Sequence, residues 1–393
     1  AATAPAGWAN GPRLMQRLAT EPRPNWKQIV EAEGLVWHTD EVPYWSEDRY
    51  YAFEDAEAEV IEAATAELVA RCYDAVDYAV AKPERLTNLG IPEEHHALVR
   101  GSWQRQDPDL MGRFDLAYCG GEDTPKLLEY NADTPAALLE SAVVQWDWLE
   151  GKGRRVVTDA DQANSVHEAL EAAFTKLAEM SGGGLMHFAA LRDYPEDAGT
   201  ADYVADVAGQ CGFEVVAMDL RDIGVTADGH FTDLEQRTIQ RLWKLYPWEE
   251  MLAEPFAANL AAANIAFLEP PWKLVLSSKA SLALLHHLFP DHPNILPAEL
   301  DGEDNALSAP LIRKSFFGRQ GTDVTPAVEP RMPGKDYILQ AETKTWTDGA
   351  RHAVIGSWVV AGAPAGLMVR ESIGPITTGD ARFVPHLLYP PRP

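Results

Sequence analysis

Apolar side chains recur every three or four positions over residues 53–84, the longest regular pattern in the chain. That spacing predicts one long amphipathic helix. Between about residues 155 and 270 the pattern alternates between helical stretches and short apolar runs. The expected helices are 161–180, 199–211 and 249–263, and the expected strands are 185–191, 214–219, 239–246 and 265–268. This alternation favours a parallel, Rossmann-like sheet, although the dinucleotide fingerprint G-x-G-x-x-G is absent from it.

The pattern changes again after residue 270. A helix is expected at 278–289, and strands are expected at 273–277, 309–314, 336–342, 354–360 and 366–371. The strand at 309–314 leads into the glycine loop Gly318-Arg319-Gln320-Gly321. A strand, a glycine loop and a second strand with an inward lysine are one way to hold a nucleoside triphosphate. The P-loop sequence G-x-x-x-x-G-K is absent, and a lone lysine at a strand end is more often solvated.

Two stretches of period-two alternation flank a turn and predict a β-hairpin that leads into a helix. The strands and the turn are residues 113–118, 126–131 and 120–123. In this hairpin Asp115 lies opposite Glu129. Arg113 lies opposite Asn131.

Facing carboxylates repel each other, so a neighbouring arginine, a bound cation or both must offset the repulsion. Two carboxylates and an amide oxygen suit a hard cation such as Mg²⁺. The helix after the hairpin is expected to begin with Asp133 or Thr134 as N-cap and Pro135 at its first position, which would present backbone N–H groups to phosphate. The alternative is an edge hairpin whose charges form a solvated surface network, and spacing alone does not separate the two.

Composition limits the function classes. The chain has 393 residues, of which 46% are hydrophobic and 24% charged, which is typical of a globular protein with two or three domains. It has no run of ~18 apolar residues, so no membrane span is expected. The N-terminal residues contain no apolar core of signal-peptide length, so we expect a cytoplasmic protein. Cys72, Cys119 and Cys211 are far apart and odd in number, which argues against a disulfide framework.

The net charge of −27 argues against nucleic acid as a partner, because nucleic acid binding needs a basic surface. A polycation such as a polyamine would be attracted to such a chain. Strong acidity also serves solubility, and that simpler explanation stays open.

Together these segments resemble the glutathionylspermidine synthase family, specifically its ATP-grasp synthetase part and stand-alone relatives described as acid–amine ligases. The matching runs include PNW at 24–26, PYWSEDRYY at 43–51, RFDLAY at 113–118, LLEYNADTP at 127–135, FTDL at 231–234, KLYPWE at 244–249, EPPWK at 269–273, SSKASLALL at 277–285 and IGSWVVAGAPAGLMVRE at 355–371. The resemblance covers most of the chain in the same order.

The resemblance implies a mixed α+β and α/β protein of ATP-grasp architecture with an inserted Rossmann-like pre-ATP-grasp domain. The implied division is an N-terminal part of the ATP-grasp core with the hairpin, a Rossmann-like substrate domain, and a lid with the rest of the core, at residues 1–150, 151–270 and 271–393. Such an enzyme uses ATP and Mg²⁺ to phosphorylate a carboxylate, and an amine then displaces the phosphate to form an amide.

The resemblance also implies roles for individual residues. Arg113, Arg319 and Arg370 are implied as catalytic residues that stabilise the transferring phosphoryl group and the acyl phosphate. The implied Mg²⁺ ligands are Asp115, Glu129 and Asn131, and the implied ATP-binding residues are Lys279, Lys314, Gly318, Gly321 and Gln340, the last in the adenine pocket. An acyl phosphate must be shielded from water, which is the usual reason for a closing loop such as the one that carries Arg319.

Three departures from the family leave the substrates open. From the length of the sequence we expect no room for the amidase domain of the bifunctional members. Ser315 follows Lys314, where proline is usual. Residues 195–197 and 244–246 do not match glutathione contacts, so neither glutathione nor spermidine is implied, although a peptide and a polyamine are candidates. The rival hypotheses are a kinase-like or non-ligating ATP-binding protein on the same fold and a non-enzymatic partner subunit, against which the facing carboxylates argue.

Overall fold

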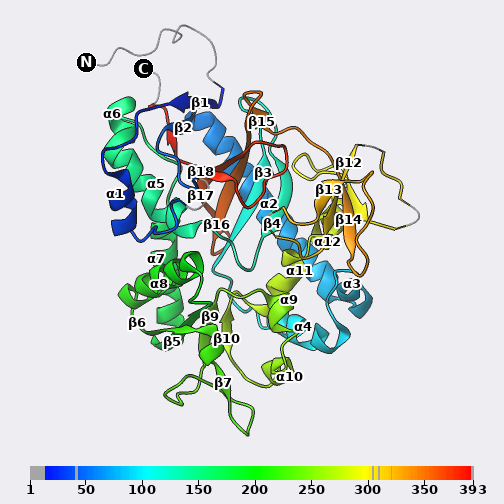
Figure 1. Cartoon of the computed structure of the whole chain (residues 1–393). Coiled ribbons are helices and arrows are strands. Elements are labelled where there is room, and N and C mark those ends of the chain that lie inside the picture. The colour runs from blue at the N-terminus through cyan, green and yellow to red at the C-terminus, as the bar shows by residue number, and fades with distance from the viewer. Residues whose placement is uncertain (1–13, 40–42, 303–304, 309, 320, 391–393) are drawn as a thin grey trace.

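The computed structural model describes residues 14–39, 43–302, 305–308, 310–319 and 321–390. Its centre is a six-stranded antiparallel sheet in the order β18-β17-β16-β3-β4, with β15 paired to β16. Figure 1 shows this sheet in the middle of the molecule, with a second sheet below it and a third to its right. The strands are β3 Met111–Ala117, β4 Lys126–Asn131, β15 Trp346–Thr347, β16 His352–Val360, β17 Ala363–Ser372 and β18 Arg382–Val384.

The long helix predicted at 53–84 is confirmed as α2, Asp55–Val80, which packs against β16 and β17. Its apolar face is buried, with Ile61, Leu68 and Val76 in the main core. A capping box begins the helix: the Glu54 side chain accepts from the backbone of Glu57, whose carboxylate accepts the Glu54 N–H. The central sheet is therefore supported on one face by a rigid helix.

The predicted parallel sheet is also confirmed, in the order β10-β9-β5-β6. Its strands are β5 Gly184–Ala190, β6 Phe213–Asp219, β9 Arg241–Lys244 and β10 Ala266–Leu268, and its helices are α7 Val166–Ser181 and α8 Pro195–Gln210. Strand β5 pairs with β6 on one side and with β9 on the other, so the strand order reverses beside it. In open parallel sheets ligands bind at the carboxyl ends of the strands at such a reversal.

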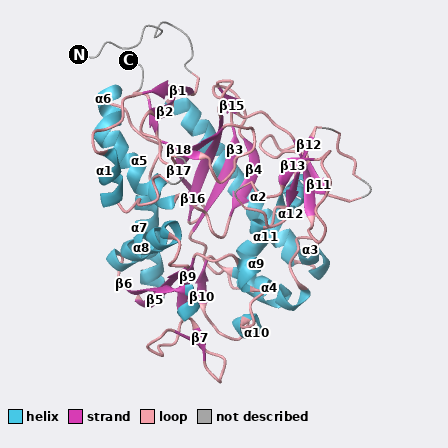
Figure 2. Cartoon of the chain, viewed as in Figure 1, coloured by secondary structure: helices cyan, strands magenta, loops and turns pink. Residues whose placement is uncertain are grey.

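A third, antiparallel sheet follows the order β11-β14-β12-β13 and packs on α12, Ala280–Leu288. Its strands are β11 Ala298–Leu300, β12 Leu311–Ser315, β13 Val324–Pro326 and β14 Tyr337–Ala341. A small sheet of β1 Gln16–Ala19, β2 Arg49–Phe53 and β19 His386–Leu388 joins the two ends of the described chain, and β7 Gly224–Val225 pairs with β8 Phe231–Thr232. Figure 2 shows helices along both flanks of these sheets.

The remaining helical segments are short. They are α1 Trp26–Ala32, α3 Pro83–Thr87, α4 His96–Gln104, α5 Gln145–Trp148, α6 Arg154–Val156, α9 Trp248–Met251, α10 Ala257–Leu260 and α11 Leu274–Ser277, with 3₁₀ turns at Glu93–His95, Leu220–Asp222 and Pro271–Lys273 and π-helical turns at Glu140–Val144 and Leu149–Gly153. The single helix expected at 249–263 is wrong, because α9 and α10 are separate.

The strand expected at 273–277 is also wrong, since a 3₁₀ turn and α11 occupy these residues. The run is buried on all sides, including Leu274, Val275 and Leu276. A short, fully buried apolar run has the same pattern in a helix and in a strand. Periodicity could not separate the two here.

Candidate functional site

The hairpin of β3 and β4 has the predicted register, with Asp115 opposite Glu129 and Arg113 opposite Asn131. It is not a solvated surface network: Arg113 is 3% exposed and Asp115 is 9% exposed. Strand β3 is buried along its whole length between β16 and β4. The alternative of an exposed charge network is therefore wrong for these residues.

Gly356 on the neighbouring strand β16 makes room for Arg113. It lies opposite Asp115, and a Cβ atom added to it would lie 2.9 Å from Cδ of Arg113. The same Cβ atom would lie 2.5 Å from Cγ of Met368, and both separations are shorter than real contacts of Cβ atoms, so a larger residue would force Arg113 or Met368 to shift. The absence of a side chain at Gly356 on β16 therefore leaves the space that the Arg113 side chain occupies.

A cavity of about 650 Å³ lies beside this hairpin. It is bordered by the carboxyl ends of β5 and β9, the start of α12, the loop after β12, and β17. Most of the site residues predicted from the sequence line it: Arg113, Asp115, Glu129, Asn131, Lys279, Gly318, Arg319, Gly321 and Arg370. The structure therefore brings together side chains that are up to about 260 positions apart in the sequence, as Arg113 and Arg370 show.

Arg113 holds Asp115 through two hydrogen bonds. Its Nε donates to Oδ1 of Asp115 at 2.8 Å, and its Nη2 donates to Oδ2 at 3.2 Å. Nη1 donates to the carbonyl of Ala136. Burial works to lower the pKa of Arg113, but Asp115 outweighs it and the pKa is raised. Arg113 is thus a permanent buried cation at one wall of the cavity.

Glu129 is paired with Lys279 instead. The Nζ atom of Lys279 lies 3.0 Å from Oε2 of Glu129 and donates to the carbonyl of Gly318 at 2.5 Å. Burial works to raise the pKa of Glu129, but Lys279 and Lys314 outweigh it and lower this pKa to about 2. Glu129 is therefore a carboxylate at neutral pH, and Lys279 links it to the glycine loop.

The donor set fits Mg²⁺ with additional ligands from a nucleotide. Asp115, Glu129 and Asn131 offer two carboxylates and an amide on one hairpin face. Within the described residues, no group of three or more His, Cys, Asp or Glu side chains could hold a metal ion. Mg²⁺ usually binds through one or two carboxylates plus phosphate oxygens, so this smaller set is sufficient.

Lys314 and Gln340 do not line the cavity. The Nζ atom of Lys314 donates to the carbonyl of Leu128 at 2.8 Å, and Nε2 of Gln340 donates to the carbonyl of Leu127 at 3.0 Å. Both side chains thus cover the free edge of β4. Burial lowers the pKa of Lys314 to about 8, and Lys279 adds to this while Glu129 opposes it.

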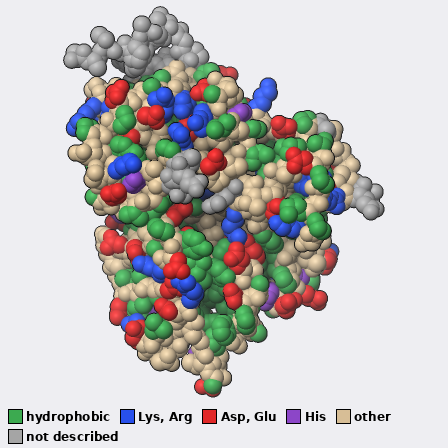
Figure 3. All heavy atoms as spheres, in the orientation of Figure 1, with side chains coloured by type: hydrophobic (Ala, Val, Ile, Leu, Met, Phe, Trp, Pro, Cys, Tyr) green, Lys and Arg blue, Asp and Glu red, His purple; other side chains and the backbone are tan. Residues whose placement is uncertain are grey.

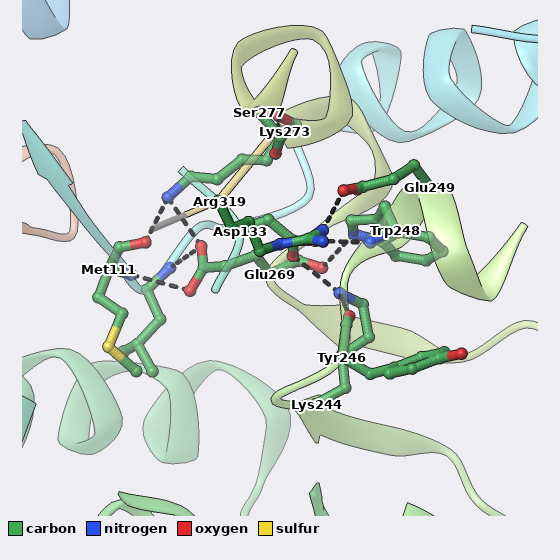
Figure 4. A network of polar contacts seen from close by, with 11 residues as sticks. Met111, Asp133, Lys244, Tyr246, Trp248, Glu249, Glu269, Lys273, Ser277 and Arg319 are labelled. Carbon is green, nitrogen blue, oxygen red and sulfur yellow. Dashed lines mark hydrogen bonds and ion pairs between the residues drawn. The ribbon is translucent and has the colours of Figure 1, made fainter. Parts of the chain in front are cut away.

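Arg319 reaches across the cavity to α9. It forms ion pairs with Glu249 and, at 2.8 Å, with Glu250, and Figure 4 shows it pointing toward Glu249. Gln320, in the same predicted glycine loop, lies outside the described residues. Burial raises the pKa of Glu249, although Arg319 opposes the shift. The loop after β12 is therefore tied to the parallel sheet by charge pairs.

A helix capped by Asp133 or Thr134 with Pro135 at its first position was expected, and this expectation is wrong, because the first helical residue after the hairpin is Leu138. Its Oδ1 accepts from Nζ of Lys244 at 2.7 Å, and its Oδ2 accepts the N–H of Trp248 at 2.7 Å. Lys244 also donates to the carbonyl of Tyr246 at 2.7 Å. Figure 4 shows Asp133 between Arg319 and Lys244. Asp133 thus fixes the turn that positions α9.

The far end of the cavity is acidic. Glu196 and Asp197, in the first turn of α8, line it together with Arg370. Behind them lies Glu140, in the π-helical turn, whose side chain is fully buried. Sequence reasoning assigned no role to Glu140, because its neighbours come from residues about 100 positions earlier and 50 positions later. The Pro-Glu-Asp start of α8 is the one local signal for Glu196 in the sequence.

Acidic and basic side chains are interspersed over the face drawn in Figure 3, so the net charge does not gather into one patch there. Among the described helices, none has the length and apolar character that crossing a membrane requires. The cysteines of the described chain are free, as expected.

Comparisons with known proteins place the chain among amide-forming enzymes. A family model described as "Glutathionylspermidine synthase preATP-grasp" matches residues 17–389. A Haemophilus influenzae protein named "Putative acid--amine ligase" is 36% identical over 401 residues, covering 96% of this chain and 100% of that protein. Trypanothione synthetase of Crithidia fasciculata is 30% identical over 342 residues, covering 79% of this chain but 52% of its own length.

The chain therefore spans about half of that trypanothione synthetase. Among solved structures, a glutathione synthetase-like effector from Globodera pallida aligns with a TM-score of 0.57 at 10% identity, covering 94% of this chain and 100% of the other. At that identity the likeness concerns the fold alone.

Proposed function

The chain belongs to the glutathionylspermidine synthase family, and from this membership we propose that it is an ATP- and Mg²⁺-dependent acid–amine ligase that works through an acyl phosphate. The amide-forming class rests on the family and its relatives. The cofactors, the intermediate and the residue roles are our proposal, which the cavity supports.

One observation carries the proposal: five cationic side chains of the described chain line a cavity that also holds two facing carboxylates. The cations are Arg113, Lys279, Arg319, Lys335 and Arg370, and the facing carboxylates are Asp115 and Glu129. Phosphoryl transfer is catalysed mainly by positioning and by charges that stabilise the transferring group. A cavity with this composition suits the transfer of a phosphoryl group to a carboxylate.

We assign different groups of cavity residues to the binding of ATP, of Mg²⁺ and of the acyl phosphate. Lys279 and the backbone around Gly318 and Gly321 would bind ATP phosphates. Asp115, Glu129 and Asn131 would hold Mg²⁺, which when bound neutralises charge on the phosphates. Arg113, with its guanidinium fixed by Asp115 and by the carbonyl of Ala136, would bind the acyl phosphate oxygens.

Lys314 and Gln340 have a less direct role in this proposal. Both side chains lie between β4 and the third sheet, bonded to backbone carbonyls of β4. An adenine ring that entered there would replace the hydrogen bond between Gln340 and the carbonyl of Leu127. Lys314 would leave the carbonyl of Leu128 to reach a phosphate. We accordingly keep Gln340 in the adenine pocket and Lys314 at the phosphates.

The architecture that fits these roles is ATP-grasp, with a nucleotide between the central and third sheets and substrates at the parallel sheet. The fold similarity to a glutathione synthetase-like protein supports this assignment. We propose the domain division expected from the sequence: residues 1–150, 151–270 and 271–393.

The relatives' names suggest the substrate classes. One is named for an acid and an amine, and another for trypanothione synthesis. We propose a small-molecule carboxylic acid and a small-molecule amine, with short peptides and polyamines as the first candidates. Leu245 and Glu250 also line the cavity, and Glu250 is paired with Arg319, so a bound substrate would meet both apolar and charged side chains there.

The test is a hydroxamate assay. The protein is incubated with ATP, Mg²⁺, hydroxylamine and one acid at a time, and both ADP and the hydroxamate are measured. We expect hydroxamate and ADP in equal amounts with one class of acid, and loss of both in Lys279→Ala. A matched control is Lys176→Ala, which changes an exposed lysine on α7. ADP formed without hydroxamate for every acid, including glutathione and short peptides, would contradict the proposal and favour a kinase-like protein.

A further inference from the structure

Glu196 occupies the acidic end of the cavity. It lies in the first turn of α8, directly after the carboxyl end of β5, and lines the cavity with Arg113 and Arg370. Most other cavity carboxylates form ion pairs, Asp115 with Arg113 and Glu129 with Lys279, whereas no ion pair of Asp197 is found within the described residues. Glu249 and Glu250 are engaged by Arg319. No ion pair involving Glu196 is found among the described residues.

Glu140 lies behind Glu196 and has an unusual environment. Its Oε1 accepts from Nε1 of Trp37 at 2.9 Å and from the hydroxyl of Tyr44 at 2.7 Å. Its Oε2 is buried and has no hydrogen-bond partner in the described part of the chain. A buried carboxyl oxygen without a partner is costly, which points to a functional reason for keeping it.

The charged groups around Glu196 come from four elements. They are Glu140 in the π-helical turn, Asp197 on α8, Arg370 on β17 and Arg113 on β3, and Tyr44 interacts with the same cluster. Burial, followed by Glu140 and Asp197, raises the pKa of Glu196 to about 7, while Arg370 and Arg113 oppose the shift. A carboxyl group with this pKa can exchange a proton at neutral pH.

The amide-forming step needs such a group. An aliphatic amine is an ammonium ion at neutral pH and has no lone pair with which to attack a carbonyl carbon. We propose that Glu196 is a catalytic residue that takes the proton from the substrate ammonium before its nitrogen attacks the acyl phosphate. This inference rests on the proposed ligase function.

The step balances as follows. The Glu196 carboxylate takes one proton from R–NH₃⁺ and becomes a carboxylic acid. The nitrogen lone pair of R–NH₂ forms the C–N bond, and the bond between carbon and the phosphate oxygen breaks. The phosphate leaves with that electron pair and takes the second nitrogen proton. Glu196 later returns its proton to water.

Glu140 is the positioning residue in this scheme. Trp37 and Tyr44 hold its carboxyl group beside Glu196, where its negative charge raises the pKa of Glu196, and burial raises the pKa of Glu140 itself. In Glu140→Gln the amide oxygen still accepts both hydrogen bonds, but the charge is removed. The pKa of Glu196 should then fall, and the base should work at lower pH.

Asp197 is a weaker candidate for the base. Burial raises its pKa to about 6 and is the cause of that shift. The charges of Arg113 and Arg370, which would hold the acyl phosphate, act on the carboxyl group of Glu196, whereas burial accounts for the shift of Asp197.

Hydroxylamine separates the base from the rest of the reaction, because it is largely unprotonated at neutral pH and needs no base. In Glu196→Gln we expect amide formation with an aliphatic amine to fall by about 100-fold or more, the lower end of a general-base contribution. Hydroxamate formation should stay near the wild-type rate. Glu179→Gln, an exposed carboxyl on α7, is the matched control and should change neither reaction.

The pH profile gives a second readout that needs no variant. In the wild type, kcat/KM for the amine should rise with pH and level off above about 7, whereas hydroxamate formation should stay flat near neutral pH and fall at lower pH only as hydroxylamine itself becomes protonated. In Glu140→Gln the rising limb should move to lower pH.

Three results would separate a failure of the base assignment from a failure of the proposed ligase function. Equal losses of amide and hydroxamate in Glu196→Gln would overturn the base assignment and indicate a binding or structural role. A profile that keeps rising as the free amine accumulates would overturn it as well. No hydroxamate in the wild type would instead contradict the ligase function itself.

Discussion

The buried pair of Asp133 and Lys244 should be among the most sensitive positions in the protein. Asp133 is 5% exposed and Lys244 is 1% exposed, and their charged atoms are 2.7 Å apart. In Asp133→Asn the side chain keeps its shape and can still accept the N–H of Trp248. The amide, however, leaves the ammonium of Lys244 buried without a counter-charge.

The expected loss of stability in Asp133→Asn follows from the burial of this ion pair. Removing one partner of a buried ion pair costs about 3–5 kcal/mol, because the remaining charge is uncompensated. Lys244 keeps its bond to the carbonyl of Tyr246 and a ring contact to Trp248, with Nζ 4.5 Å from the ring centroid. These contacts should hold the cost near the lower end of that range. We therefore expect the free energy of unfolding to fall by about 3 kcal/mol.

Urea unfolding followed by circular dichroism measures this change. The matched control is Asp202→Asn, which breaks the ion pair between Asp202 and Arg192. The side chain of Asp202 is 52% exposed and that of Arg192 is 34% exposed. An exposed pair is worth about 0–1 kcal/mol, so the control should shift the unfolding midpoint little. Replacing the pair together, as Asp133→Leu with Lys244→Met, should recover most of the loss. If Asp133→Asn destabilised the protein no more than Asp202→Asn, the assigned role of this pair would be wrong.

The other predictions concern ligands. Mg²⁺–ATP should raise the melting temperature of the wild type, and Asp115→Asn and Glu129→Gln should lose turnover while remaining folded; full activity in both would remove the metal assignment. Lys314→Ala should weaken ATP binding in calorimetry, and an unchanged affinity would exclude Lys314 from the phosphate site. Trypsin should cut after Arg319 in the free protein more slowly once ATP and both substrates are bound, whereas equal rates would indicate a rigid turn. Glu249→Gln should speed the cut in the free protein, because it weakens the contact that holds Arg319.

The pairing of Asp115 with Glu129 could be predicted because its determinants are local, and it followed from about 20 residues. Strict alternation failed nearer the turn, where a β-bulge between Asp115 and Leu116 shifts the register, so that Leu127 rather than Leu128 is buried. The long helix α2 and the parallel sheet were also predictable from local determinants. Their signals are strong periodicity over a continuous stretch.

The errors arose where distant residues decide the structure. Asp133 has the composition of a helix cap, but its partner Lys244 lies 111 positions further along the chain. The environment of Glu140 is likewise set by Trp37, which is 103 positions away. Nothing local distinguishes such residues from caps and surface carboxylates. The acidic end of the cavity therefore emerged only from the fold.

The central claim is that the acid is activated as an acyl phosphate. It can be tested with the acid labelled with ¹⁸O in its carboxyl group, supplied with ATP, Mg²⁺ and the amine, by measuring the phosphate released by mass spectrometry. An acyl phosphate transfers one carboxyl oxygen to phosphate, so each phosphate should carry one labelled oxygen for each amide formed. Unlabelled phosphate released together with the amide would contradict the account.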